Sequence, residues 1–250
     1  MSDLNLPKVS CICPTFARVY LLEEAIESFL RQDYKGEKEL IICNDFYQQE
    51  LVYEHPEVKI YNLPERCPTL GDKKNQTYSY TTGEYMIIWE DDDIFLHGRI
   101  SRLVNAILEI NSEFMFEGPH IILYGGKINY QPFTTAGSNI ISKKLFEEIG
   151  GFPLINSGED QAFNEKLRKN LNKQLDTCSN PNAQFFYRFT SPRSHISQHG
   201  PDKEDKKSGY QIMLETAEEL IMSGQEPKGR YELKPHWKKD WIEEVKSALI

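Results

Sequence analysis

The chain has 250 residues, a moderate apolar content of 39% and a formal net charge of −9. This length suits one large domain or two small ones, and the 12% of aromatic residues argues against general disorder. The negative charge excludes a broad nucleic-acid-binding surface, which is normally basic, but it is compatible with a local basic groove. We therefore expect a folded protein with no extended nucleic-acid surface.

The cysteines and the N-terminus indicate where the protein works. Five cysteines include no CxxC pair, and Cys11, Cys13 and Cys43 lie in apolar runs where a free thiol acts as a small buried hydrophobe. Free thiols suit a reducing compartment. No apolar run reaches the length of a transmembrane helix, and residues 1–5 lack the pattern of a signal peptide. We expect a cytoplasmic protein, with peripheral contact at a membrane left open.

The first half of the chain alternates short apolar runs with helical patterns. The apolar runs predict strands at residues 8–13, where Pro14 should end the ladder, and at 39–43, 58–61 and 85–89. Amphipathic spacing predicts helices at 72–82, at 96–110, and in a segment whose apolar face is Leu22, Ala25, Ile26, Phe29 and Leu30. The polar stretch at 47–56 is assigned no element. Strands that alternate with helices predict βαβ units and a mostly parallel sheet.

Beyond residue 112 the pattern is less regular. It predicts strands at 121–124, 138–141 and 184–189, a short helix at 142–149, a helix after Gly158, a charged loop at 201–208 and two amphipathic helices at about 210–222 and 237–249. The fold class is therefore α/β, with a mostly parallel sheet flanked by helices and with further helices at the C-terminus.

One stretch has an unusual order of residues: the apolar run at 85–89 ends in four consecutive acids, Glu90–Asp93. Burying an unpaired carboxylate costs several kcal/mol, so these acids should lie at the carboxyl end of the strand, where open α/β sheets bind ligands. A divalent cation best relieves their repulsion, and oxygen ligands suit Mg²⁺ or Mn²⁺. The alternative is a solvated acidic turn.

Polar residues follow two other predicted strands, at Pro14-Thr15 and Asn44-Asp45. A parallel topology brings these ends to the same edge as the acids, where Asp45 could read the edge of a nucleotide base. Asp45 could equally cap a helix or form a turn. Lys73-Lys74-Asn75 could place cations near phosphates, or the two lysines could lie on an exposed basic helix face.

Two further groups are candidates for chemistry. Glu159-Asp160 opens a helix, where a carboxylate could act as a general base or serve only as a favourable charge in the first turn. His195 and His199 flank Ser197, and either histidine could ligate a metal or contact phosphate. A histidine at the surface with neither role is the alternative.

At this point several segments, in order and with their spacing intact, resemble family 2 glycosyltransferases with the GT-A fold. The segments are residues 9–16, 28–34, 39–45, 83–93 with its acidic motif, and 146–152 followed by Glu159-Asp160. The resemblance runs from about residue 8 to 170. It implies a Rossmann-like sheet, with a nucleotide-sugar-binding half at 1–112, an acceptor-binding half at 113–200, and a charged loop and C-terminal helices at 201–250.

The resemblance also implies a reaction and the residues that carry it. A sugar would pass from a nucleotide sugar, with a UDP-sugar favoured, to a hydroxyl of a glycan, lipid-linked or other acceptor in polysaccharide or glycoconjugate synthesis, with inversion and with Mn²⁺ or Mg²⁺. Asp160, with Glu159, would be catalytic. The nucleotide would be bound by Pro14, Thr15, Phe16, Arg18, Asp45, Lys73, Asn75 and Asp91, and the metal by Asp92, Asp93 and His195. The C-terminal helices could form a homodimer.

Two departures from the family pattern leave alternatives open. Glu90 stands where the acidic motif usually begins with Asp, so the ligating pair is either Asp91 with Asp93 or Glu90 with Asp92. Phe46-Tyr47 replaces a small turn after Asp45. Two other functions remain: a nucleotide-sugar-binding protein without catalysis, and a nucleotidyltransferase. The latter should have a glycine-rich loop after the first strand, and residues 14–18 contain no glycine.

Overall fold

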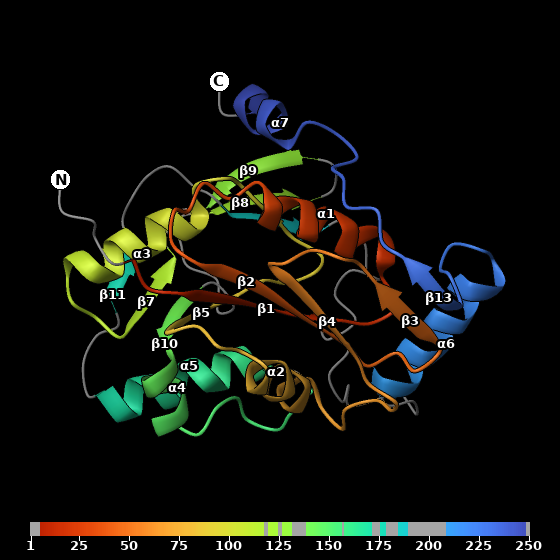
Figure 1. Ribbon diagram of the computed structural model, residues 1–250, viewed down its shortest axis with the longest axis horizontal. Helices are drawn as coiled ribbons and strands as arrows, with labels where there is room; N and C mark the ends of the chain where they lie inside the picture. The colour runs from red at the N-terminus through yellow and green to blue at the C-terminus, as the bar shows by residue number, and fades with distance from the viewer. Residues whose placement is uncertain are drawn as a thin grey trace.

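The computed structural model describes residues 6–117, 120–124, 127–131, 139–156, 158–171, 176–178, 185–189 and 209–248. A central seven-stranded sheet crosses the molecule in the order β11-β7-β10-β5-β1-β2-β4 (Figure 1). Its strands are β1 (Val9–Thr15), β2 (Lys38–Asn44), β4 (Val58–Asn62), β5 (Tyr85–Ile88), β7 (Phe114–Glu117), β10 (Asn139–Ser142) and β11 (Asp176–Cys178). Because β1 is parallel to β2 and β5, and β2 is parallel to β4, these strands end at the same edge. Only β10 runs antiparallel to its neighbours.

Helices cover both faces of this sheet (Figure 1). α1 (Val19–Leu30) and α3 (Arg99–Glu109) lie on one face, and α2 (Leu70–Ser79), α4 (Lys143–Glu148) and α5 (Glu159–Leu171) lie on the other. Alternate strand residues point to opposite faces, so Cys11 and Ile87 pack with α1 and α3 while Ile12 and Ile88 pack with α4 and α5. The sheet therefore has one apolar core on each side.

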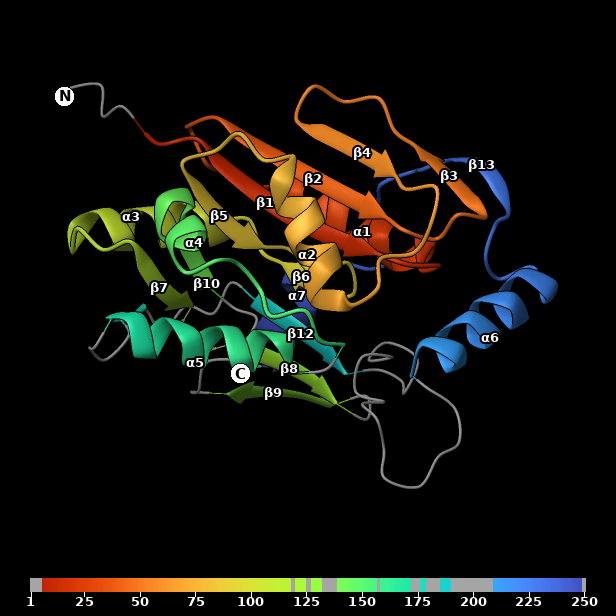
Figure 2. The same cartoon turned by 90° about the horizontal axis from the view of Figure 1, so that it is seen from below.

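Two smaller sheets complete the fold (Figure 2). One has the order β6-β12-β8-β9, with β6 (Ile94–Phe95), β12 (Phe185–Phe189), β8 (His120–Tyr124) and β9 (Lys127–Gln131). The other pairs β3 (Gln49–Val52) with β13 (Gly229–Glu232), which are parallel. The last helices are α6 (Gly209–Met222) and α7 (Trp241–Ala248). Within the described residues, no helix is long and apolar enough to cross a membrane.

The mostly parallel α/β sheet predicted from the sequence is confirmed, although β6, β7, β9, β11 and β13 were not predicted. Three further details are corrected. β1 continues through Pro14, which lies opposite Cys43 of β2. The pairing of β1 with β5 ends at Ile12, so beyond that point the missing N–H of Pro14 is tolerated. The polar stretch at 47–56 contains β3. The last helix begins at Trp241, since residues 233–240 form an irregular segment instead. The predicted loop at 201–208 lies outside the described residues.

A buried carboxylate ties the amino-terminal ends of the strands together. Glu39 at the start of β2 accepts hydrogen bonds from Ser10 Oγ (2.7 Å), from Thr82 N and Oγ1 (2.6 and 2.9 Å), and from Lys59 Nζ (2.8 Å). Burial alone would raise the pKa of Glu39, but these donors, Lys59 foremost, outweigh it and lower the pKa to about 2. The ionised form of Glu39 thus stabilises the fold.

Replacing Glu39 with glutamine should change the pH dependence of stability. The pKa of Glu39 is lower in the folded chain than the ordinary value of 4.5, so its contribution is complete above pH 4.5 and is lost as pH falls toward 2. Thermal unfolding between pH 6 and about pH 2 should therefore show a lower Tm for the variant at pH 6 and a shallower decline on acidification. Parallel Tm profiles for the two proteins would contradict this assignment.

Candidate active site

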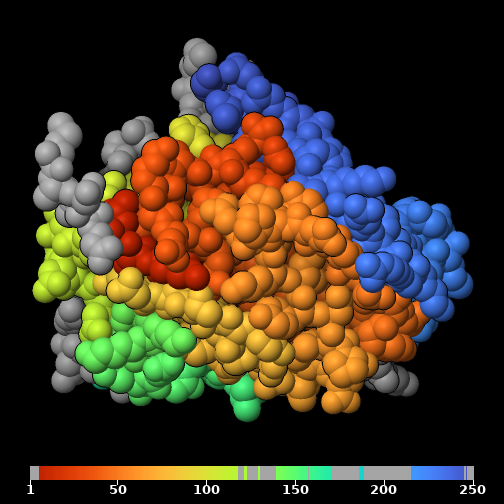
Figure 3. Space-filling model, viewed as in Figure 1, coloured from red at the N-terminus to blue at the C-terminus, as the bar shows by residue number. Residues whose placement is uncertain are grey.

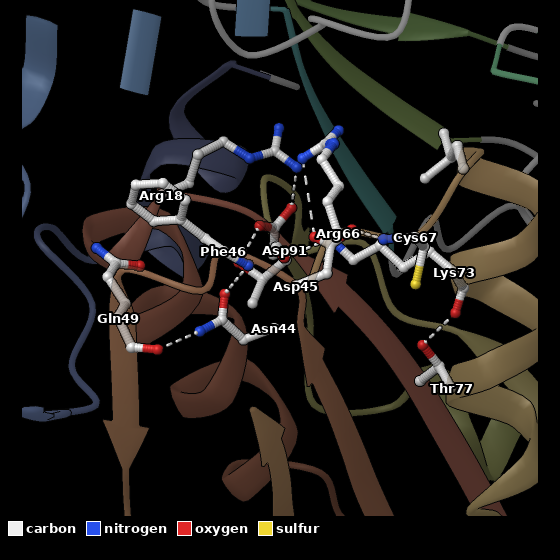
Figure 4. Close-up of polar contacts among 12 residues, drawn as sticks. Arg18, Asn44, Asp45, Phe46, Gln49, Arg66, Cys67, Lys73, Thr77 and Asp91 are labelled. Carbon is white, nitrogen blue, oxygen red and sulfur yellow. Dashed lines mark hydrogen bonds and ion pairs between the residues drawn. The ribbon is translucent and has the colours of Figure 1, made fainter. Parts of the chain in front are cut away.

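The carboxyl ends of β1, β2 and β5 meet, as the parallel topology predicts, and bring three separate parts of the chain together (Figure 4). Thr15 Oγ1 at the end of β1 donates to Asp91 Oδ2 at 2.6 Å. Lys73 Nζ from α2 lies 2.6 Å from Asp45 Oδ1 and also donates to the carbonyl of Thr15. The site therefore joins strand ends and α2 through buried, charged contacts.

The acids after β5 do not form a solvated turn. Asp91, Asp92 and Asp93 are 0%, 7% and 2% exposed. The Arg18 guanidinium, placed just before α1, bridges Asp91 Oδ1 at 2.5 Å and Asp92 Oδ2 at 2.9 Å. Burial still raises the pKa of Asp91 to about 6, against the opposing effect of Arg18. Burial thus leaves the carboxylates of the loop poorly solvated, and a bound cation would stabilise their ionised form.

A second arginine holds the same loop from the other side. Arg188 on β12 donates its backbone N–H to Asp93 Oδ1 at 3.0 Å, and its Nε donates to the carbonyl of Asp92 at 2.5 Å. Sequence reasoning missed Arg188 because it lies 95 residues from the loop, within an aromatic run that carries no motif. Burial, followed by the charge of Asp92, raises the pKa of Asp93 well above its usual range.

Lys74 joins the acidic loop to the start of α5. Its ammonium is buried and lies 2.8 Å from Glu90 Oε1 and 2.9 Å from Glu159 Oε1. Desolvation opposes this charge, but the carboxylates of Glu90 and Glu159 outweigh it and raise the pKa of Lys74 above its usual value. The reading of Lys73 and Lys74 as an exposed basic helix face is wrong, because they are 4% and 2% exposed.

Asp45 lies among aromatic and cationic side chains. Its Oδ2 accepts from the backbone N–H of Cys67 at 3.1 Å, and the Arg66 guanidinium lies 3.8 Å from its Oδ1 (Figure 4). Arg66 also stacks over the ring of Phe16, 3.9 Å from the ring centroid, and Phe16 packs against Phe46. Cys67 and Arg66 both belong to the segment before α2. Asp45 is therefore bonded to a distant part of the chain and does not cap a local helix. Arg66 was not singled out from the sequence.

Asn75 and the carboxylate pair of α5 belong to one substructure. The side-chain amide of Asn75 is hydrogen bonded at both ends to the backbone of Phe152, at 2.9 Å each, which connects α2 to the segment before α5. Glu159 is buried against Lys74, whereas Asp160 is half-buried and its Oδ1 accepts from the N–H of Gln161. The two acids therefore have different environments, and Asp160 is the more accessible.

The donor set suits a divalent metal that completes its coordination on a substrate. Within the segments that the structure describes, no group of three or more His, Cys, Asp or Glu side chains could hold a metal ion by itself. Mg²⁺ characteristically takes one or two carboxylates and fills its remaining positions with phosphate oxygens and water. Asp92, whose side chain is 10% exposed beside Asp93, fits such a site. His195 and His199 lie outside the described residues.

A parallel sheet whose strand ends present an acidic loop, with a carboxylate pair on an adjoining helix, is the arrangement that the resemblance to GT-A glycosyltransferases implies. Residues 10–158 match the model of the glycosyl transferase family 2, and the chain belongs to that family. The resemblance seen in the sequence is thereby confirmed at the level of the family.

Curated relatives match part of the chain. A GalNAc(5)-diNAcBac-PP-undecaprenol beta-1,3-glucosyltransferase of Campylobacter jejuni is 32% identical over 111 residues, which are 42% of this chain and 36% of that protein. The UDP-Glc:alpha-D-GlcNAc-diphosphoundecaprenol beta-1,3-glucosyltransferase WfgD of Escherichia coli is 25% identical over 118 residues, 46% of each chain. This chain thus spans less than half the length of these relatives.

Solved structures share the fold. S. aureus TarS 1-349 in complex with UDP-GlcNAc superposes with a TM-score of 0.59 at 18% identity, covering 74% of this chain and 59% of TarS. Its complex with UDP covers 86% of this chain with a TM-score of 0.58. At 18% identity, the structural similarity establishes the GT-A fold and nothing more specific.

Proposed function

We propose that the protein transfers a sugar from a UDP-sugar to a hydroxyl group of a lipid-linked glycan, with inversion at the anomeric carbon. The observation that carries the proposal is the Lys74 ammonium, which holds the acidic loop and the Glu159-Asp160 pair within one hydrogen-bonded unit. On this proposal, the catalytic base would lie next to the site of the donor diphosphate. Lipid-linked sugars are named for both curated relatives, which supports this acceptor class and peripheral contact with a membrane.

The surroundings of Asp45 support a UDP-sugar as the donor. The Asp45 carboxylate is buried with the cations Lys73 and Arg66, and Arg66 stacks on Phe16. A carboxylate oxygen can accept a hydrogen bond from the ring N–H of uracil. The names of WfgD and of the TarS complexes, which include UDP-Glc, UDP-GlcNAc and UDP, support the same choice. Arg18 and Lys73 supply positive charge at the strand ends for the phosphates.

The chemistry requires a base and a stabilised leaving group. Asp160 would take the proton of the acceptor hydroxyl as the hydroxyl attacks the anomeric carbon, while the ion pair with Lys74 orients Glu159. A divalent metal held by Asp92 and Asp93, with His195 as a further candidate, would neutralise the departing diphosphate. Direct displacement needs no covalent intermediate, so no nucleophile–base pair is required.

A panel of nucleotide sugars tests the proposal. Purified protein should be stabilised against heat by UDP-sugars more than by GDP- or dTDP-sugars, and more strongly with Mn²⁺ present. With the stabilising donor, an undecaprenyl-diphosphate-linked sugar should accept the glycosyl group, and the product should have the anomeric configuration opposite to the donor's. Binding of the donor without transfer or hydrolysis would favour a non-catalytic binding protein, and release of diphosphate would favour a nucleotidyltransferase.

Replacing Asp45 with alanine should weaken UDP binding by about 10–100-fold, since a charge-assisted hydrogen bond of this kind contributes roughly 1.5–3 kcal/mol. Isothermal titration calorimetry gives the affinity directly. Lys73 and Arg66 lose a partner in this variant, so thermal unfolding should be measured alongside to show that the fold persists. Unchanged UDP affinity, or tighter binding of GDP than UDP by the parent protein, would refute the assignment.

A further inference from the structure

The segment 224–241, which we call the C-terminal segment, lies against α1 outside the region that matches the family model. Figure 3 shows these residues in blue against the red and orange surface of the N-terminal part. The backbone N–H of Lys234 donates to Glu23 Oε1 at 2.8 Å, and that of Lys238 donates to Glu24 Oε1 at 3.1 Å. Two neighbouring carboxylates of α1 thus accept hydrogen bonds from the backbone of the C-terminal segment.

Glu24 has partners on two sides. Its Oε1 also accepts from Trp241 Nε1 at 2.9 Å, and its Oε2 accepts from Arg188 NH1 at 2.5 Å. The Arg188 guanidinium lies 5.6 Å from the centroid of the Trp241 ring, so all three side chains are in contact. Glu24 and Arg188 are both almost fully buried. One carboxylate therefore connects the C-terminal segment to β12.

Arg188 carries the connection on to the acidic loop. The same guanidinium that pairs with Glu24 donates through Nε to the carbonyl of Asp92, while the backbone N–H of Arg188 donates to the Asp93 carboxylate. The Asp92 side chain points the other way, to Arg18. Arg188 consequently holds the backbone carbonyl of Asp92, and Glu24 holds the guanidinium of Arg188.

We propose that Glu24 is a positioning residue for the donor site: it orients Arg188, which orients Asp92 and Asp93, and the C-terminal segment completes the arrangement through Trp241. The inference rests on the proposed function of the acidic loop in donor binding. A buried ion pair contributes little net stability, because desolvation offsets its attraction and apolar residues of the same size often stabilise as much. Stability alone therefore does not account for the pair, whereas orientation of the loop does.

Two neighbouring glutamates give a matched test. Glu24→Gln and Glu23→Gln each weaken a contact with the C-terminal segment, but only Glu24 contacts Arg188. Calorimetric titration with UDP and Mn²⁺ should show affinity lowered by about 10–100-fold in Glu24→Gln, the usual effect of removing a group that orients ligand-binding residues. The donor KM should rise by a similar factor. Glu23→Gln should lower Tm while UDP affinity stays at the parent value.

A charge-balanced double variant separates orientation from stability. Glu24→Gln leaves Arg188 buried without its carboxylate, which is destabilising, and Glu24→Gln with Arg188→Met removes both charges. Tm should recover in the double variant, but UDP affinity should stay low because the carbonyl of Asp92 has lost its donor. If Glu24→Gln fails to fold, the double variant is compared directly with the parent.

The outcomes distinguish this inference from the proposed function. Recovery of UDP affinity together with Tm in the double variant, or equal loss of affinity in Glu23→Gln and Glu24→Gln, would overturn the positioning role of Glu24 alone. A parent protein that binds neither UDP nor any other nucleotide would overturn the proposed function and this inference with it.

Discussion

Replacing Asp160 with asparagine is expected to lower turnover by roughly 10²–10⁴-fold, the usual contribution of general base catalysis, with donor affinity almost unchanged. Asparagine keeps the size and shape of the side chain but cannot take a proton. The environments of the two acids favour Asp160 over Glu159 as the base, because Glu159 is buried against Lys74 and Asp160 is half-buried. Steady-state kinetics with a saturating donor, together with UDP titration, measures both quantities.

Glu159→Gln is the matched control for this prediction. It removes the partner of Lys74 rather than the base, so it should lower Tm and affect turnover less than Asp160→Asn does. Near-normal turnover in Asp160→Asn with an inactive Glu159→Gln would reverse the two assignments. A product that retains the configuration of the donor would contradict direct displacement altogether.

Asp92→Asn should lower kcat/KM by about 10²–10³-fold, which is the range for losing one group that stabilises charge developing on a leaving group. Asp92 is the most exposed aspartate of the acidic loop, and it shares Arg18 with Asp91. On the proposed function, the variant removes the charge of one metal-ligating oxygen as well as a like-charge contact. The fold should therefore persist, while UDP affinity falls and the Mn²⁺ concentration for half-maximal activity rises. Activity in excess EDTA provides a second readout.

Asp72→Asn is a suitable control for Asp92→Asn, because Asp72 is an aspartate of the nearby α2 that is not part of the acidic loop. It should leave the Mn²⁺ dependence unaltered. Full activity of the parent in excess EDTA, or an unaltered Mn²⁺ requirement in Asp92→Asn, would show that the acidic loop does not serve a metal.

The sequence predicted those parts of the site that follow from local pattern and parallel topology. Residues 40–43 and 85–89 are continuous apolar runs, so their strands were evident, and parallel pairing then required Asp45 and the acids to meet. The contact of Lys74 with Glu159 was not predictable, because the two residues lie 85 positions apart and no local pattern relates them.

Two of the strands missed by sequence reasoning, β3 and β13, share a physical cause. β3 places only Gln49 and Leu51 inward, and β13 is almost wholly exposed, so neither contains an apolar run. Each exists because the other supplies its hydrogen bonds, about 180 residues away in the chain. Arg188 and Glu24 were missed for a similar reason, since a buried ion pair gives no periodic signal.

The pairing of β3 with β13 has a practical consequence for anyone who shortens this protein. A chain cut at residue 158, where the family match ends, would lose β13 and expose the backbone N–H and C=O groups of β3 along one side. On its other side β3 is hydrogen bonded to β4 through the Asn62 side-chain amide, which bonds the backbone of Leu51. Such an open strand recruits strands from other molecules, so the truncated protein should aggregate during expression while the longer chain stays dispersed.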